Sequence, residues 1–327
     1  MNLNSLKNKK IGILGLGIEN QALVKYLLKH KVKCEITVCD ARVDVKMKKE
    51  NAGLRVKPAM TDTRIHWQLG GGFNKNLEKF DILFRAPGWP IDCPGIIKAF
   101  KFKSPQPPFV KGGIMLSSPM KLFFDLCPTR NIIGVTGTKG KGTTSSLIYE
   151  ILKAAGKRAW LGGNIGVAPF EFIDKIKKND WVVLELSSFQ LEDMAVSPRI
   201  AVVTNLYPEH LAPADPRNPN YHGTLKKYWA AKWNIVKYQK RGDAVVLNSK
   251  SQTSNPKQIP NPKSQILKQI KSKIVYFKKS ELLSKLIGEH NQENIAAAVE
   301  VAKIVGVKDE IIKKAVAGFK GLPHRLE

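Results

Sequence analysis

Cysteine is scarce in this chain of 327 residues, which holds four cysteines. None of them stands in Cys-x-x-Cys spacing, so the sequence indicates neither a disulfide framework nor a structural zinc site. Long apolar runs are missing as well, because no stretch approaches the ~20 apolar residues that span a bilayer. The N-terminus, Met-Asn-Leu-Asn-Ser-Leu-Lys, has no apolar signal region. We therefore expect a cytoplasmic protein with no membrane partner.

Acidic residues are also few, since 27 Asp and Glu stand against 54 Lys and Arg and give a formal net charge of +27. Such an excess suggests nucleic-acid binding. The lysines are scattered, however, and neither an aromatic platform for bases nor zinc spacing accompanies them. We favour a solvated basic surface that attracts polyphosphate nucleotides, and we expect no nucleic-acid partner. A steep salt dependence of DNA or RNA affinity would indicate the alternative.

Apolar strand runs alternate with helical patterns along the chain, which predicts an α/β fold. Continuous Val, Ile and Leu runs are typical of strands buried on both faces of a parallel sheet. The length suits two domains. We expect a Rossmann-like domain over residues 1–113 and a P-loop ATPase-type domain with a mostly parallel sheet over 114–320, separated by the proline- and glycine-rich segment 104–113.

Residues 10–40 have the pattern of a nucleotide-binding βαβ unit. The turn Gly15-Leu-Gly17 follows the first strand, and Asp40 ends the second, where a ribose-binding acid would stand. Asn20 takes the place of the third glycine of a dinucleotide fingerprint. We therefore expect a different ligand on the same scaffold.

A glycine-rich loop follows the apolar strand at residues 132–136. Its glycines let backbone N–H groups converge on phosphate oxygens, and Lys141 adds a positive charge near the β and γ phosphates. In the standard loop a hydroxyl residue directly follows the lysine and binds Mg²⁺, whereas here Gly142 follows it and the hydroxyls are displaced by one and two positions. The sequence predicts an ATP site formed by Gly137, Thr138, Lys139, Gly140, Lys141, Gly142, Thr143 and Thr144.

The form Thr-Gly-Thr-Lys-Gly-Lys-Gly-Thr resembles the ATP loop of the Mur ligase and folylpolyglutamate synthetase superfamily, which joins a carboxylate to an amine at the expense of ATP. The Gly-x-Gly first domain, the run Leu-Glu-Leu-Ser-Ser-Phe-Gln at 184–190 and Gly-Leu-Pro-His-Arg at 321–325 extend the resemblance to Mur ligases over nearly the whole chain. It implies the addition of D-glutamate to UDP-N-acetylmuramoyl-L-alanine through an acyl phosphate. Such a reaction serves peptidoglycan and cell-wall synthesis, and through it cell shape and division.

Four catalytic residues follow from this resemblance, and Lys141 is the first of them. Glu185 ends a strand at the carboxyl edge of a sheet, where a buried carboxylate needs a cation, and the family uses it as a Mg²⁺ ligand. His210, preceded by Glu209 in place of the family's aspartate, would assist a second Mg²⁺. Lys232 would be carbamylated, which converts an ammonium group into an anion that attracts a hard cation. The implied metal ligands, for two Mg²⁺ ions, are Thr143, Glu185, His210 and Lys232.

Further ligand contacts are implied in the same way. Asn291 and Asn294 stand one helical turn apart and would lie on the adenine side, with Arg325 as another ATP contact. A helix N-cap at Asn291 is the alternative role. The resemblance assigns the uridine diphosphate group to Ile18, Glu19, Asp40, Ala41 and Arg42, and the muramoyl-peptide part to Asn164, Ser187 and Gln190.

Members of the family enter a third, Rossmann-like domain where this chain reaches residues 321–327, which we interpret as the start of a linker. That domain supplies the site of the incoming amino acid. We therefore expect a monomeric fragment of the full enzyme that binds ATP and the UDP-sugar weakly and ligates poorly or not at all. A sister amide ligase of the same superfamily and a non-catalytic nucleotide-binding module stay open as alternatives.

Overall fold

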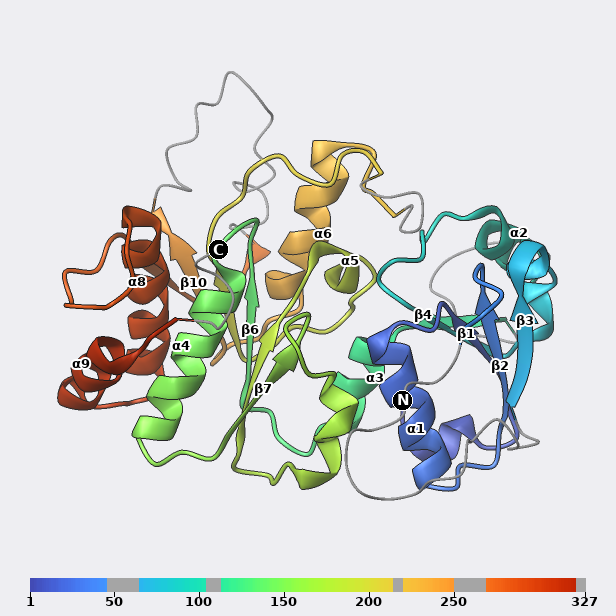
Figure 1. The fold of residues 1–327 in the computed structure, drawn as a ribbon, viewed down its shortest axis with the longest axis horizontal. Coiled ribbons are helices and arrows are strands. Elements are labelled where there is room, and N and C mark those ends of the chain that lie inside the picture. Colours follow the sequence, from blue (N-terminus) through green and yellow to red (C-terminus); the bar gives the residue numbers. More distant parts are fainter. Residues whose placement is uncertain (46–64, 104–112, 214–219, 250–268, 322–327) are drawn as a thin grey trace. The chain divides into compact units, whose positions relative to one another are not determined.

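A computed structural model describes residues 1–45, 65–103, 113–213, 220–249 and 269–321 (Figure 1). They fall into two compact units, here called the first and the second unit. The predicted α/β class is confirmed, because both units hold a sheet whose paired strands are all parallel. Residues 104–112 and Arg325 lie outside the described residues. No helix in the described ranges has the length and hydropathy to cross a membrane.

The first unit contains residues 1–126 with two short later segments, 169–171 and 213–221. Its sheet has the order β3-β2-β1-β4-β5, which is the order of the first five strands of an open Rossmann sheet. The strands are β1 (Lys10–Leu14), β2 (Glu35–Asp40), β3 (Ile65–Leu69), β4 (Ile82–Arg85) and β5 (Met115–Ser117). The helices are α1 (Ile18–Lys29), α2 (Pro94–Lys103) and α3 (Pro119–Leu126), with single turns at Leu3–Leu6, Gly70–Gly72, Leu77–Lys79 and Pro169–Glu171.

The first unit extends further along the chain than the boundary at residue 113 that the sequence suggested. The reason is β5, which pairs in parallel with β4 and so adds a fifth strand to the first sheet. Helix α3 follows β5 directly, and the main segment of the unit ends with it at Leu126. The proline- and glycine-rich segment therefore precedes a strand of the first sheet.

The second unit has a six-stranded sheet in the order β11-β10-β9-β6-β8-β7. The strands are β6 (Ile132–Thr136), β7 (Ala159–Gly163), β8 (Trp181–Glu185), β9 (Ile200–Val203), β10 (Ala244–Asn248) and β11 (Lys273–Phe277). The helices are α4 (Lys141–Ala154), α5 (Ser188–Leu191), α6 (Leu225–Lys237), α8 (Glu289–Ile304) and α9 (Asp309–Gly318), with a further turn at Ile173–Lys175. Strand β6 lies between β8 and β9, so the loop that follows β6 opens at an inner position of the sheet.

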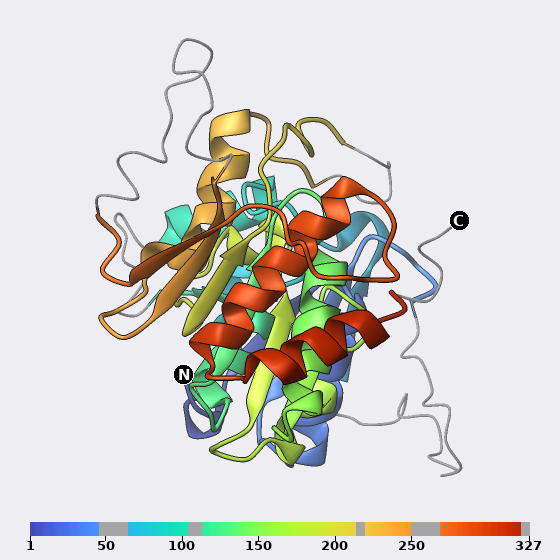
Figure 2. The same cartoon turned by 90° about the vertical axis from the view of Figure 1, so that its left-hand side faces the viewer.

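The main core of the second unit lies where α4, α8 and α9 cover one face of the sheet (Figure 2). Leu147 and Ile151 of α4 and Val301 of α8 are fully buried there against Val135 of β6. Each such side chain contributes roughly 1.5–3 kcal/mol by leaving water. On β6 the neighbouring Gly134 faces the other way, toward Ile235 of α6. This close packing on both faces holds the phosphate-loop strand rigidly.

Candidate active site

The phosphate loop, residues 137–140, joins β6 to the N-terminus of α4 in the second unit. Gly137 and Gly140 have φ angles of 148° and 80°, which favour glycine. A Cβ on Gly137 would collide with the Thr204 hydroxyl, and one on Gly140 with the Asn294 side chain. Gly140 is the N-cap of α4 and makes no side-chain cap, so the helix start keeps backbone donors for an anion.

Two lysines converge on this loop from different helices. Lys141 Nζ donates to the carbonyl oxygens of Gly137 and Thr138 at 3.1 and 2.9 Å, and Lys232 Nζ, from α6, donates to the Gly137 oxygen at 2.8 Å. Lys232 is 2% exposed. Burial first, and the charge of Lys141 second, lower the pKa of Lys232 to about 7 against the opposing influence of two carboxylates. The local arrangement is suited to an anion with several charges.

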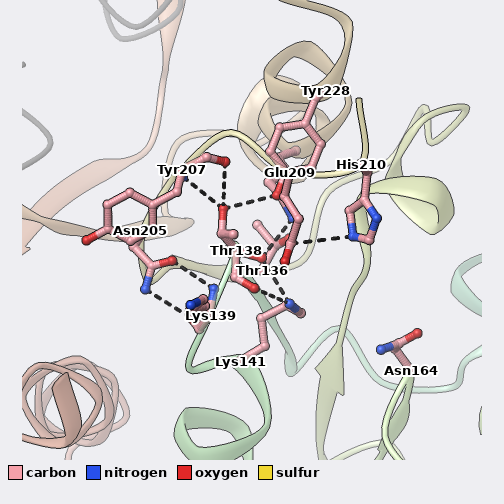
Figure 3. Close-up of polar contacts among 12 residues, drawn as sticks. Thr136, Thr138, Lys139, Lys141, Asn164, Asn205, Tyr207, Glu209, His210 and Tyr228 are labelled. Carbon is pink, nitrogen blue, oxygen red and sulfur yellow. Dashed lines mark hydrogen bonds and ion pairs between the residues drawn. The ribbon is translucent and has the colours of Figure 1, made fainter. Parts of the chain in front are cut away.

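The segment after β9 is tied to the phosphate loop by a hydrogen-bond network (Figure 3). The Thr138 and Lys139 N–H groups donate to the backbone and side-chain oxygens of Asn205 at 2.9 and 2.8 Å. The Thr138 hydroxyl accepts from the Tyr207 N–H at 2.9 Å and lies 3.0 Å from the phenol oxygen of Tyr228. Thr138 and Lys139 were both predicted to bind ATP. In the structure, their N–H groups and the Thr138 hydroxyl bond to the segment after β9 and to α6.

The two threonines at the start of α4 have different surroundings. Thr144 is fully buried, and its hydroxyl donates to Asn294 Oδ1 at 3.4 Å. Thr143 is half-buried and lines a cavity beside the phosphate loop. Asn294 in turn donates to Asn291 Oδ1 at 3.1 Å, so the predicted pairing of the two asparagines on one helix face is confirmed. The alternative role of Asn291 as an N-cap is wrong, because α8 begins two residues earlier, at Glu289, and its N-cap is Gly288.

The cavity has a volume of about 390 Å³ and is bounded by the phosphate loop, α8 and the residues around positions 285–287 and 320–321. Within the described part of the chain, no acidic side chain lines it. Sequence reasoning missed several of its lining residues, among them Lys285, Leu286, Ile287, His290 and Lys320. Their proximity in sequence to Asn291 and to the Gly-Leu-Pro-His-Arg run was the available signal. An apolar wall with several cationic groups fits a nucleotide.

Glu185 lies at the carboxyl end of β8 and is 3% exposed. The Asn164 side-chain amide donates to Glu185 Oε1 at 2.8 Å, and the Asn164 N–H donates to the Glu185 carbonyl at 2.9 Å. Gly163, which precedes Asn164, has a φ of 104°, and a Cβ on Gly163 would collide with the Glu185 carbonyl oxygen. Asn164, predicted as a substrate contact, therefore holds the Glu185 carboxylate in place.

His210 has a φ of 56°, a strained angle for a residue with a side chain. Its carbonyl accepts the His222 N–H at 2.9 Å, and its Nε2 lies 3.5 Å from Glu209 Oε2. Burial is the main cause that lowers the pKa of His210; Glu209 opposes this shift, and the charges of Lys232, His222 and Lys141 add to it. The ring of Phe189 packs against both histidines and is stacked on His222 with a centroid separation of 4.7 Å. Sequence reasoning missed His222, which is 2% exposed.

Ser187 and Gln190 were predicted to contact the muramoyl substrate. In the structure they form a capping box at the start of α5: Ser187 Oγ accepts the Gln190 N–H at 3.2 Å, and Gln190 Oε1 accepts the Ser187 N–H at 2.7 Å. Gln190 is 2% exposed. The described hydrogen bonds of this pair therefore cap the N-terminus of α5, directly after the strand that carries Glu185.

The predicted residues of the first unit gather at the carboxyl ends of β1 and β2. Asp40 accepts the Leu16 N–H at 2.8 Å and three hydrogen bonds from Arg42 at 2.8–3.0 Å. Burial alone would raise the pKa of Asp40, but these bonds and the Arg42 charge lower it overall. Ile18 is 59% exposed at the start of α1, whose N-cap, Gly17, makes no side-chain cap. Glu19 beside it is half-buried and Ala41 is exposed.

Asn20 explains the missing third glycine of the fingerprint. It is fully buried, and its amide donates to the carbonyls of Gly15, Leu14 and Phe84 at 2.7, 3.3 and 3.3 Å. The side chain thus joins the β1 turn to β4. A dinucleotide fingerprint has a glycine there for close helix–strand packing, and in this chain the Asn20 side chain occupies that position.

Among the described residues, no group of three or more His, Cys, Asp or Glu side chains could hold a metal ion by itself. Mg²⁺ does not need such a group, because it is usually bound by one or two carboxylates together with substrate phosphates and water. Glu185, buried and held by one amide, fits that requirement. A Mg²⁺ ion at Glu185 would therefore need phosphate oxygens as further ligands.

Comparison with known proteins identifies the same regions. Residues 135–302 match the Mur ligase middle domain. The chain is 36% identical to the UDP-N-acetylmuramoylalanine–D-glutamate ligase of Acetivibrio thermocellus and 35% identical to that of Clostridium kluyveri. Each alignment covers 98% of this chain and 67% of the relative.

Solved structures agree with this in fold. The UDP-N-acetylmuramate:L-alanyl-gamma-D-glutamyl-meso-diaminopimelate ligase from Neisseria meningitides matches with a TM-score of 0.57 at 17% identity, over 97% of this chain and 99% of that one. The murein peptide ligase from Psychrobacter arcticus gives the same TM-score at 15% identity, over 98% and 70%. Because of the domain match and the relatives that align with 98% of its length, we conclude that this chain belongs to the Mur ligase family.

Proposed function

We propose that the protein adds D-glutamate to UDP-N-acetylmuramoyl-L-alanine at the expense of ATP, as a step of peptidoglycan synthesis in the cytoplasm that sustains cell shape and division. One observation carries the ATP-dependent part: two lysine ammonium groups meet at the Gly137 carbonyl, beside a helix start with open N–H donors. The names of relatives at 35–36% identity support the choice of substrates.

The nucleotide would lie along the cavity beside the phosphate loop. The start of α4 and Lys141 would hold the phosphates, and Asn291 and Asn294 the adenine side, with Arg325 as a further ATP contact. Mg²⁺, when bound, would offset the charge of carboxylate and phosphate as they approach. Its proposed ligands are Thr143, Glu185, His210 and carbamylated Lys232, for two ions.

The proposed reaction has two steps. An oxygen of the alanine carboxylate attacks the γ-phosphorus, which forms an acyl phosphate as the bond to ADP breaks. The amine of D-glutamate then attacks the acyl carbon, inorganic phosphate leaves with the bonding electron pair, and the amine loses a proton. Lys141 supports both steps by positioning and by charge, since phosphoryl transfer depends mainly on these two.

Carbamylation of Lys232 is supported by its environment. With a pKa of about 7, a large part of the amine is neutral and nucleophilic at physiological pH. The nitrogen would attack the carbon of CO₂, one C=O electron pair would move to oxygen, and the amine would release a proton. The product is an anion beside Lys141, which replaces repulsion by attraction. A ¹³C NMR signal of a carbamate, present with ¹³CO₂ and absent in Lys232→Met, would support this modification.

In the first unit, we propose that Ile18, Glu19, Asp40, Ala41 and Arg42 hold the uridine diphosphate group. The open start of α1 supports a phosphate contact, and the carboxyl ends of β1 and β2 are where Rossmann folds bind ligands. Asn164, Ser187 and Gln190 remain proposed contacts of the muramoyl-peptide part. Ser187 and Gln190 would act mainly by fixing the turn after Glu185.

The test is the D-glutamate-dependent release of ADP and phosphate with UDP-N-acetylmuramoyl-L-alanine, compared with UDP-N-acetylmuramate plus L-alanine. Activity with the first substrate alone supports the proposal, and activity with the second indicates a sister ligase. The chain spans 67% of the relatives it matches, so ATP affinity with and without Mg²⁺ is measured in parallel. ATP binding without any turnover would favour a non-catalytic nucleotide-binding module.

A further inference from the structure

Tyr228 lies at the centre of the candidate active site, yet neither the phosphate-loop motif nor the metal-ligand set includes it. It is 0% exposed and stands one turn before Lys232 on α6. Its phenol oxygen lies 3.0 Å from the Thr138 hydroxyl of the phosphate loop (Figure 3). Because Thr138 donates its own proton to the Tyr207 carbonyl at 3.2 Å, the Tyr228 hydroxyl is the donor to Thr138.

The ring of Tyr228 contacts the other proposed active-site groups. Lys232 Nζ lies 4.8 Å from the ring centroid, within the range of a cation–π interaction. The His210 and His222 rings pack against it with centroid separations of 5.9 and 5.4 Å. One buried side chain therefore touches the phosphate loop, the lysine of α6 and the histidine of the segment after β9.

We infer that Tyr228 is a positioning residue that holds the phosphate loop in register with Lys232 and His210. Through Thr138 its hydroxyl fixes the loop, and through its ring it fixes the two catalytic side chains. Burial raises the pKa of the phenol to about 12, so the hydroxyl keeps the proton that it donates. The effect of Tyr228 on ATP binding rests on the proposed function. The positioning of the loop does not, because it can be measured in the protein without ligands.

The experiment compares Tyr228→Phe, which removes one oxygen and keeps the ring, with Tyr238→Phe as a matched control. Tyr238 is the C-cap of the same helix and is 38% exposed, away from the phosphate loop contacts. Peptide-resolved hydrogen exchange is measured on the free proteins. The reporters are the N–H groups of Thr138, Lys139 and Tyr207, whose acceptors belong to the network.

Tyr228→Phe should raise exchange at these three amides about fivefold or more, the effect of one lost hydrogen bond. Exchange in the buried strand β10 should stay as in the wild type. The affinity for ATP should fall by a similar factor, and in steady state the KM for ATP should rise while the KM for the UDP-sugar stays constant. Tyr238→Phe should leave all of these unchanged.

Unchanged exchange at the three amides in Tyr228→Phe would overturn the inference. So would an equal rise in β10, because that pattern means a general loss of stability. If the wild type neither binds ATP nor turns over, the proposed function fails while the exchange pattern still decides the role of Tyr228.

Discussion

Lys141 and Lys232 donate to the same acceptor, the carbonyl oxygen of Gly137, although they come from different helices. The charge of Lys141 helps to lower the pKa of Lys232, with Glu209 and Glu185 acting in the opposite direction, so the two amines repel each other when both are protonated. This repulsion is relieved by an anion between them, by loss of a proton or by conversion of one amine into an anion. A phosphoryl-transfer site can use each of these three changes to balance the charge of its substrates.

The first prediction concerns the pH dependence of stability. The pKa of Lys232 is about 7 in the folded protein and 10.5 when unperturbed. Between these values the unfolded chain binds more protons, so the free energy of unfolding should rise with pH from about 7 to 10.5. The rise should reach roughly 4–5 kcal/mol at most. Urea unfolding in CO₂-free buffer should show this slope in the wild type and lose it in Lys232→Met. An equal slope in both proteins would contradict the prediction.

A second prediction isolates the close approach at Gly140. Gly140 and Gly242 have similar φ angles, 80° and 89°, but only Gly140 has a side chain, Asn294, in the way of a Cβ. Gly242→Ala should therefore lose only about 1–2 kcal/mol, for the backbone angle. Gly140→Ala should lose about 1–3 kcal/mol more, for overpacking. Equal losses in urea unfolding would show that Asn294 moves aside freely.

A third prediction uses the glycine that follows Lys141. Gly142 lies in the first turn of α4, at the position where a standard phosphate loop has a Mg²⁺-binding hydroxyl. Gly142→Ser should increase the Mg²⁺ dependence of ATP affinity, whereas Gly142→Ala, which adds only a methyl group, should not. Calorimetric titrations with and without Mg²⁺ measure both. The same response in the two variants would mean that Thr143 already supplies the hydroxyl.

A fourth prediction concerns Asp40 and Arg42 in the first unit. Their hydrogen bonds lower the pKa of Asp40 below 3.8, so this pair adds stability above that pH, and the contribution is lost as pH falls through the lower folded value. Arg42→Met should lower the urea midpoint at pH 6 and flatten its fall below pH 4. Lys9→Met is the control, because Lys9 and Asp81 form an exposed pair at 3.9 Å. Identical pH profiles for both variants would contradict the prediction.

Much of the second unit could be predicted because its signals are local. The phosphate loop is recognisable from its glycines, which adopt positive φ angles. The contact between Asn291 and Asn294 follows from their spacing of three residues on one helix. Asp40 was predicted to end the second strand, and β2 ends there. In the same way the pattern Ser-x-x-Gln at Ser187 signals a capping box, a local role that the resemblance to substrate contacts concealed.

Other features depend on neighbours far along the chain, and no local pattern shows them. Tyr228 and His222 acquire their roles from the rings that pack around them. Strand β5 has three residues, too few for a periodic signal, and only its pairing with β4 assigns it to the first sheet. Thr138 was predicted from its motif to face the nucleotide, while its hydroxyl binds Tyr228.

The parallel order of the second sheet also affects how the protein is made. The phosphate loop emerges early, but its bond to Lys232 joins residues 95 positions apart, and Thr144 and Asn294 are 150 apart. Contacts of such long sequence separation slow folding. During synthesis the loop therefore waits for α6 and α8 to leave the ribosome, so the nascent chain can acquire its nucleotide site only late in translation.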